Sequence, residues 1–118
     1  MTPKTTIAMA GVVFLGLAPS LGAKERMARC YLSVDSKAYL DQTCIFDADK
    51  DGSFSIGTAG ENGTVRMPFY AYVNKDPDGT ANGYWNEDAS VTHAKALLGV
   101  LKRSGACWVN RRAKVCAY

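Results

Sequence analysis

Hydrophobic and polar positions alternate along much of this chain. Cys30, Leu32 and Val34 alternate with more polar neighbours, and residues 38–40 return after a turn at residues 35–37. The apolar residues of the stretch 64–73 follow the same period of two. Because successive side chains of a strand point to opposite faces, this pattern is typical of half-buried β-strands. We therefore predict an all-β fold.

The C-terminal residues 106–118 predict a hairpin. A two-residue turn at Arg111-Arg112 sets Trp108 opposite Val115 and Cys107 opposite Cys116. Arg-Arg is poor turn chemistry, since the favoured two-residue turns use Asn or Gly at positive φ. We expect a disulfide across the hairpin to compensate for this turn.

An aspartate-rich segment has two interpretations. Asp47, Asp49 and Asp51, followed by Gly52, match the D-x-D-x-D-G start of an EF-hand calcium loop. Thr58, at the twelfth position, cannot supply the bidentate carboxylate, and the flanking segments are not helical. Asp51-Gly52 between apolar runs is a strong hairpin signal. We interpret the segment as a turn, with a calcium site formed by the three aspartates as the alternative.

The middle of the chain is predicted to form one long strand between loops. Residues 57–63 are glycine-rich and predict a loop, and residues 64–73 form the longest apolar and aromatic run. Tyr70 and Tyr72 fall on the other face of this strand, and we interpret them as completing a second packed face. Pro68 cannot donate to a ladder, so we expect the strand to be bent or to lie at an edge.

Two aromatic residues follow a stretch dense in turn formers. Residues 74–83 predict an exposed loop, and Tyr84 and Trp85 come directly after it. They form either a lid on the core or a contact surface. For residues 90–96 we predict a short helix or turn, and for residues 97–102 a strand. The fold class is thus a small antiparallel barrel or meander of about six to eight strands with at most one short helix.

The N-terminal residues 1–23 resemble a secretory signal peptide. Lys4 precedes an apolar run at residues 7–17, and small residues follow at 18–23. The run is too short to span a bilayer. The nearest following cysteine is Cys30, so we expect no lipid anchor. Residues 24–118 are then one secreted, periplasmic domain.

The four cysteines are expected to form disulfides. An even count after a signal peptide predicts bridges, and four cysteines allow three connectivities that the sequence alone does not decide. We favour Cys30–Cys44 and Cys107–Cys116, because each pair can lie across one hairpin. Cys30 and Cys44 are in register about the turn at residues 35–37. A metal site formed by cysteines is disfavoured, because no pair has C-x-x-C spacing.

The charge distribution is uneven. Loss of Lys4 with the leader leaves thirteen of the 14 basic residues against 11 acidic ones. No acidic residue follows Asp88, whereas six basic residues do: Lys95, Lys102, Arg103, Arg111, Arg112 and Lys114. They form either the solvated outer face of a hairpin or a surface for an anionic partner. The export signal disfavours nucleic acid as that partner.

Catalytic residues are few. His93 is the single histidine and lies near Ser90 and Thr92, but no orienting acid completes a nucleophile–base set. The motifs G-x-S-x-G and H-E-x-x-H and a phosphate-binding loop are absent. We predict a protein that is not an enzyme and that carries no cofactor.

One segment resembles a known family. Gly83-Tyr84-Trp85-Asn86 running on to Thr92-His93-Ala94-Lys95, in a cysteine-tied β domain after a leader without a lipid-attachment cysteine, is similar to the periplasmic inhibitors of c-type lysozyme. In that family a small antiparallel barrel presents loops that block the lysozyme cleft, through a serine-glycine motif and a lysine-bearing motif. Here no serine precedes Gly83, and Lys95 follows the aromatic residues at a greater distance than in the family.

The resemblance implies a partner and a contact surface. The partner is c-type lysozyme, a usually cationic protein whose cleft holds two carboxylates. The partner-binding residues that the resemblance implies are Gly83, Tyr84, Trp85, Asn86, Thr92, His93 and Lys95. The alternative function is a calcium-stabilised envelope module that uses Asp47, Asp49 and Asp51.

Overall fold

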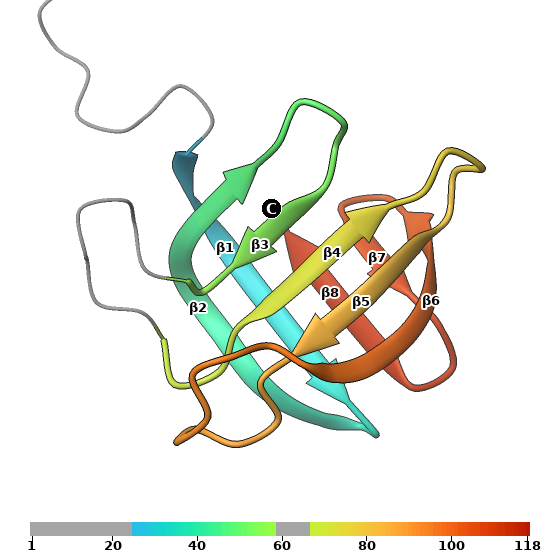
Figure 1. Ribbon diagram of the computed structural model, residues 1–118. Helices are drawn as coiled ribbons and strands as arrows, with labels where there is room; N and C mark the ends of the chain where they lie inside the picture. The colour runs from blue at the N-terminus through green and yellow to red at the C-terminus, as the bar shows by residue number, and fades with distance from the viewer. Residues whose placement is uncertain (1–24, 59–66) are drawn as a thin grey trace, which may run out of the picture.

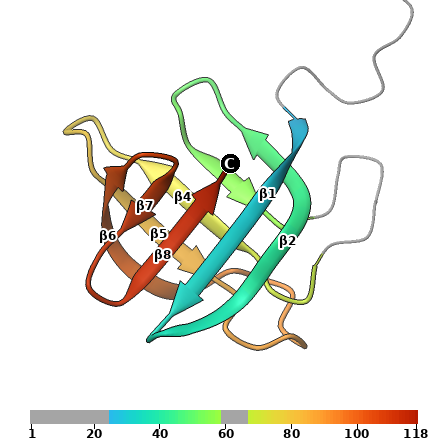
Figure 2. The same ribbon diagram turned by 180° about the vertical axis from the view of Figure 1, so that it is seen from behind.

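The chain forms a closed antiparallel barrel (Figure 1, Figure 2). A computed structural model describes residues 25–58 and 67–118, in which each strand pairs with the next and the last pairs with the first. The strands are β1 (Glu25–Val34), β2 (Lys37–Ala48), β3 (Phe54–Ile56), β4 (Ala71–Lys75), β5 (Ala81–Trp85), β6 (Ala96–Ser104), β7 (Cys107–Val109) and β8 (Ala113–Ala117). These residues contain no helix, so the predicted all-β barrel is confirmed.

Some predictions fall outside the described residues. The predicted signal peptide, residues 1–23, is one of them, as are residues 59–66, which include most of the predicted loop 57–63 and the start of the predicted strand 64–73. Within residues 25–58 and 67–118, no helix with the length and apolarity needed to cross a membrane is present.

The alternation in the sequence sets which side chains fill the barrel. In β1 the residues Ala28, Cys30, Leu32 and Val34 are buried, whereas their neighbours along the strand are partly or fully exposed. The pairing of β5 with β6 shifts between Gly83 and Tyr84, which leaves Leu98 as an extra residue of a β-bulge. The core that results includes Leu32, Ile56, Val73, Leu98, Leu101 and Val115.

Three aromatic rings close one end of this core. Tyr39 lies 5.0 Å from Phe69 and 4.7 Å from Trp85, measured between ring centroids, and the last two rings are 6.1 Å apart. Edge-to-face contacts of this kind add to the free energy gained by burial. Trp85 is only 3% exposed, so of its two predicted roles the lid on the core is the one observed.

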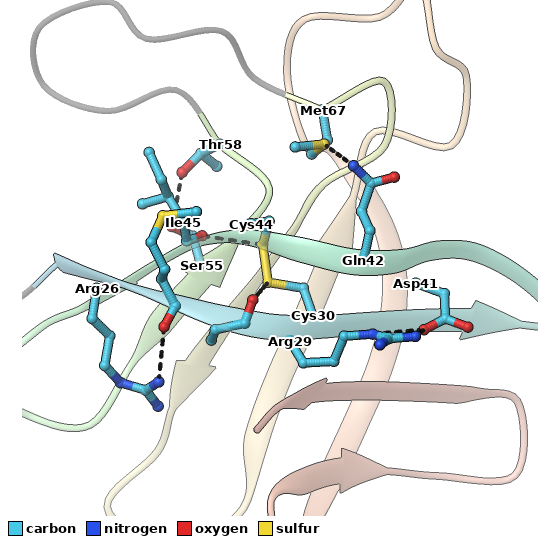
Figure 3. The surroundings of a disulfide bond; sticks show 12 residues. Arg26, Arg29, Cys30, Asp41, Gln42, Cys44, Ile45, Ser55, Thr58 and Met67 are labelled. Atoms are coloured by element: carbon cyan, nitrogen blue, oxygen red, sulfur yellow. Dashed lines mark hydrogen bonds and ion pairs between the residues drawn. A yellow bond between two sulfur atoms is a disulfide. The ribbon is translucent and has the colours of Figure 1, made fainter.

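Both predicted disulfides are confirmed, but one predicted register is wrong. Cys107 faces Cys116 directly, as predicted. Cys30 instead faces Gln42, and Cys44 faces Ala28. Cys30 opposite Cys44 would need a loop centred on residue 37, whereas the observed turn contains only Asp35 and Ser36. The bulge between Leu32 and Ser33 recovers one residue of this offset, and the Cys30–Cys44 bridge runs diagonally between β1 and β2, with its Cα atoms 5.9 Å apart (Figure 3).

The turn at Arg111-Arg112 is held by a neighbouring side chain. The Asn110 side-chain oxygen accepts hydrogen bonds from the backbone N–H groups of Arg112 (2.8 Å) and Ala113 (2.7 Å). The Asn110 amide donates to the carbonyl oxygens of Leu98 (2.9 Å) and Val100 (3.1 Å) on β6. Asn110 therefore supplies the turn chemistry that the arginines lack.

The aspartate-rich segment forms a hairpin turn, as predicted. The backbone N–H of Asp49 donates to the oxygen of Ser53 at 2.8 Å, and Gly52 donates to Asp49 at 3.1 Å with a φ of 95°. The Asp51 carboxylate accepts a hydrogen bond from the Ser53 N–H at 2.9 Å. This bond lowers the pKa of Asp51 below 3.8. The segment thus joins β2 to β3.

Two predicted elements differ from the structure, and a third takes one of its two predicted forms. The exposed loop predicted at residues 74–83 is shorter than expected, because β4 continues to Lys75 and β5 begins at Ala81. In residues 67–73, the described part of the strand predicted at residues 64–73, strand pairing begins only at Ala71, where β4 starts, because residues 67–70 form a bend at Pro68. The segment 90–96 is a turn and irregular chain until β6 begins at Ala96, so of its two predicted forms the turn is observed.

Candidate functional site

Several residues singled out in the sequence line one groove on the outside of the barrel. The groove has a volume of about 430 Å³ and lies between β4, β5 and the segment that leads into β6. Of the predicted partner-binding residues, Tyr84, Thr92, His93 and Lys95 line it. The complete lining is Tyr70, Tyr72, Asn74, Tyr84, Thr92, His93, Ala94 and Lys95. We call it the tyrosine groove.

The floor of the tyrosine groove is a cross-strand pair. Tyr72 of β4 lies directly opposite Tyr84 of β5. Both point outward, since the strand neighbours of Tyr72, Ala71 and Val73, are completely buried. The row continues to Leu97 of β6, which is 60% exposed. Paired aromatic side chains on a sheet face give a rigid apolar surface, which suits contact with a partner.

Burial changes the acidity of one of these tyrosines. Tyr72 is 40% exposed, and partial burial raises the pKa of its phenol above 10.0, with smaller contributions from Tyr70 and Asp47. The Tyr70 ring lies 6.4 Å from that of Tyr72 and is itself buried. At neutral pH the Tyr72 phenol is therefore neutral and can donate and accept hydrogen bonds.

Asn86 fixes the wall of the groove. Its side-chain oxygen accepts a hydrogen bond from the Tyr70 N–H at 3.1 Å, and its amide donates to the carbonyl oxygens of Pro68 (2.8 Å), Asp88 (3.0 Å) and Val91 (3.3 Å). Asn86 is 3% exposed. It thus joins the start of β4 to the segment that bears the groove residues.

Asp88 orders the next part of this wall. Its carboxylate accepts hydrogen bonds from the Ser90 N–H at 2.9 Å and from the Ser90 hydroxyl at 2.8 Å. These bonds lower the pKa of Asp88 below 3.8. The segment then continues through Thr92 and His93 to Lys95, and all three are exposed.

Three of the predicted partner-binding residues do not line the groove. Gly83 is buried, and a Cβ there would lie 2.7 Å from Leu101 Cδ1, so the barrel wall needs a glycine at this position. Trp85 lies in the core and Asn86 under the loop. These residues act on the groove only by supporting it from beneath.

Other groove residues were not predicted. Tyr70 and Tyr72 were interpreted as a second packed face, and Asn74 was assigned to a loop. Their alternation with Ala71 and Val73 was the available signal, because it sets Tyr72 and Asn74 on the outer face. The sequence could not show that Tyr72 pairs with Tyr84.

A smaller acidic hollow adjoins the tyrosine groove. It has a volume of about 190 Å³ and shares Tyr72 and Asn74 with the groove, and its other lining residues include Asp47 and Asp49. One Asp47 carboxylate oxygen is buried there without a hydrogen-bond partner. The outer face thus carries negative charge on one side of the tyrosines and the cationic Lys95 on the other.

The predicted calcium ligands do not converge. In residues 25–58 and 67–118 no group of three or more histidine, cysteine, aspartate or glutamate side chains could hold a metal ion. Asp47 and Asp49 line the acidic hollow, whereas Asp51 bonds to Ser53 in the turn. The alternative of a calcium module therefore rests on the sequence pattern alone.

The tyrosine groove offers phenol, hydroxyl, imidazole and ammonium groups at its surface. Ser90 lies close to His93 in the sequence, and its hydroxyl donates a hydrogen bond to the Asp88 carboxylate. Lys95 makes no ion pair with the described residues. Searches of protein-family models, curated proteins and solved structures found no match to this chain. The function is therefore argued from the groove and from the resemblance noted in the sequence.

Proposed function

We propose that this chain binds a c-type lysozyme and inhibits it by blocking its active-site cleft. The observation that carries the proposal is the gathering of Tyr84, Thr92, His93 and Lys95 in one groove. These residues were selected from the sequence by their resemblance to the periplasmic lysozyme inhibitors. The predicted export would bring the protein to the periplasm, where a lysozyme acts on the cell wall. We propose no catalytic activity for it.

The charge of Lys95 suits such a cleft. Glycosidases of this kind use two carboxyl groups in different environments, one as acid and one ionised. An ammonium group has three donors, so Lys95 can bond to both carboxyl groups at once. Its side chain makes no ion pair with the described residues, so binding breaks no ion pair among them.

The aromatic floor would supply most of the contact area. Tyr72 and Tyr84 present their rings in a fixed cross-strand arrangement. Tyrosine loses little conformational entropy on binding and is enriched among the residues that dominate interface free energies. The closed barrel and its two disulfides hold these rings in place before the partner arrives, which reduces the entropic cost of association.

The acidic hollow adds charge complementarity. Asp47 and Asp49 lie beside the tyrosines, on the side away from Lys95. The resemblance implies a partner that is cationic outside its carboxylate-lined cleft. Lys95 would therefore face the cleft, and the two aspartates its basic rim. Opposed charges of this kind mainly speed association and fix orientation.

Direct binding measurements test the proposal. A biosensor carrying a c-type lysozyme should capture the purified protein, and Lys95→Ala should speed dissociation because short-range contacts control that rate. Lys114→Ala is the matched control, because it removes one positive charge from the outer face of β8. The proposal is wrong if the wild-type protein does not bind, or if both variants weaken binding equally.

A further inference from the structure

The start of β1 and the end of β8 lie together at one end of the barrel (Figure 1, Figure 2). Residues at this end line a second hollow. Its volume is about 210 Å³. It is lined by Arg26, Phe46, Gly52, Phe54, Arg103, Ala106, Trp108 and Ala117. We call this hollow the barrel mouth. It shares no lining residue with the tyrosine groove.

Two arginines stand at inward positions on the rim of the barrel mouth. Arg26 precedes the buried Ala28 by two residues in β1, and Arg103 follows the buried Leu101 by two residues in β6. Residues two apart in a strand share a face. Such positions normally hold apolar residues that fill the barrel. The presence of arginine at two such inward positions indicates that this end of the barrel binds a polar or charged group.

Aromatic rings hold both guanidinium groups. The Arg26 Cζ atom lies 4.6 Å from the centroid of the Phe46 ring, and the Arg103 Cζ atom lies 5.9 Å from that of Trp108. Cation–π contacts stabilise each group on its ring. Phe54, which lies 5.2 Å from Phe46 between centroids, extends the aromatic lining. The barrel mouth thus combines flat apolar walls with two cations that lie over aromatic rings.

Neither cation of the barrel mouth is neutralised by the described residues. Arg29 pairs with Asp41 at 2.7 Å and Arg112 with Asp35 at 3.2 Å. Arg26 and Arg103 have no carboxylate partner among residues 25–58 and 67–118, and no acidic side chain lines the hollow.

Most donors of these two arginines remain available. Within the described part of the chain, Arg26 donates one N–H to the Met27 carbonyl oxygen at 3.4 Å, and Arg103 one to the Gly105 carbonyl oxygen at 2.8 Å. A guanidinium group has five N–H donors. An anion between the two arginines would use the free donors and remove the repulsion between two like charges.

We infer that the barrel mouth binds a small organic anion, a carboxylate on a planar aromatic body. A cavity of about 150 Å³ is known to hold a benzene ring, so a hollow of about 210 Å³ has room for a ring and one carboxylate. Phe46, Phe54 and Trp108 would contact the ring, and the guanidinium groups would bind the carboxylate in their preferred fork geometry. This site is independent of the proposed lysozyme contact.

Calorimetric titration of the purified protein with benzoate tests this inference. Benzamide has the same ring without the charge, and inorganic phosphate has charge without the ring. We expect benzoate to bind roughly tenfold or more tightly than either, because charge-assisted bonds and ring contacts both contribute. Equal binding of benzamide would exclude the arginines as the cause, and equal binding of phosphate would exclude the aromatic body. No heat at millimolar benzoate would overturn the inference as a whole.

Matched variants locate the site. Arg26→Met and Arg103→Met should each weaken benzoate binding by roughly tenfold, and Arg26→Lys should recover only part of the loss, because lysine lacks the fork geometry. Arg111→Met is the control, because it removes one exposed positive charge from the turn between β7 and β8 at the opposite end of the barrel. An equal loss in the Arg111 variant would contradict the site. The comparison of benzoate with benzamide needs no variant, so it remains decisive if a substitution disturbs folding.

Discussion

The side-chain oxygen of Asn86 accepts a hydrogen bond from the backbone N–H of Tyr70, 3.1 Å away and 16 positions earlier in the chain. This bond ties the start of β4 to the segment that carries Thr92, His93 and Lys95. Because the Asn86 amide also bonds to carbonyl oxygens on both sides, one buried side chain sets the distance between the floor and the wall of the tyrosine groove.

Replacement of Asn86 should destabilise the protein and loosen the groove. Asn86→Ala leaves the Tyr70 N–H and several carbonyl oxygens without their partner, and each buried unsatisfied group costs about 1–3 kcal/mol. Urea unfolding should show this loss in the free energy of unfolding. Asn82→Ala, on the outer face of β5, is the control and should cost less, since Asn82 is only half-buried. Equal losses would contradict the special role of Asn86.

Gly83→Ala should destabilise the barrel through packing in its interior, because Gly83 does not line the surface proposed to contact a partner. The new Cβ would lie 2.7 Å from Leu101 Cδ1 and 3.1 Å from Leu98 Cβ, and overpacking of a core typically costs about 1–3 kcal/mol. Thermal unfolding measures the effect. Tyr84→Phe, on the next residue of β5, keeps the ring and should unfold like the wild-type protein. A Gly83→Ala variant of unchanged stability would disprove this packing role.

Asn110→Ala should weaken the C-terminal hairpin more than substitution of Arg111 in its turn. Asn110 makes four side-chain hydrogen bonds that join the turn to β6, so its loss should cost about 1–3 kcal/mol. Arg111→Ala should change the free energy of unfolding by less than about 0.5 kcal/mol, as is usual for surface positions. Urea unfolding of both variants measures these two free-energy changes. A larger loss for Arg111→Ala than for Asn110→Ala would refute the role of Asn110 in holding the turn.

Much of the barrel, but less of the groove, could be predicted from the sequence. The period of two predicted inward residues such as Leu32, and the symmetry about Arg111-Arg112 predicted the Cys107–Cys116 register. The predicted Cys30–Cys44 register is wrong because the turn at Asp35-Ser36 is tighter than a loop centred on residue 37, and no glycine or asparagine marks that two-residue turn. Tyr84 and Lys95 were predicted, whereas Tyr72 was missed as their neighbour because strand pairing is a long-range property.

The segment that bears the groove residues should loosen in acid. Hydrogen bonds from Ser90 hold the pKa of Asp88 below 3.8, so the folded state favours the carboxylate. The stabilisation is fully present above the unfolded-state pKa and is lost as the pH falls below 3.8 towards the folded-state pKa. At pH 7 the free energy of unfolding of Asp88→Ala should therefore be lower than that of the wild-type protein. This difference should shrink as the pH falls below 3.8. A difference that stayed constant with pH would contradict the carboxylate as its source.

Lysis of a cell-wall suspension by a c-type lysozyme tests the central claim most directly. Purified protein in molar excess should stop the lysis, because Lys95 and the tyrosine pair would occupy the cleft. Lys95→Ala and Tyr84→Ala should restore lysis at concentrations where Lys114→Ala still inhibits. If an excess of the wild-type protein leaves the lysis rate unchanged, the protein is not an inhibitor of this enzyme class.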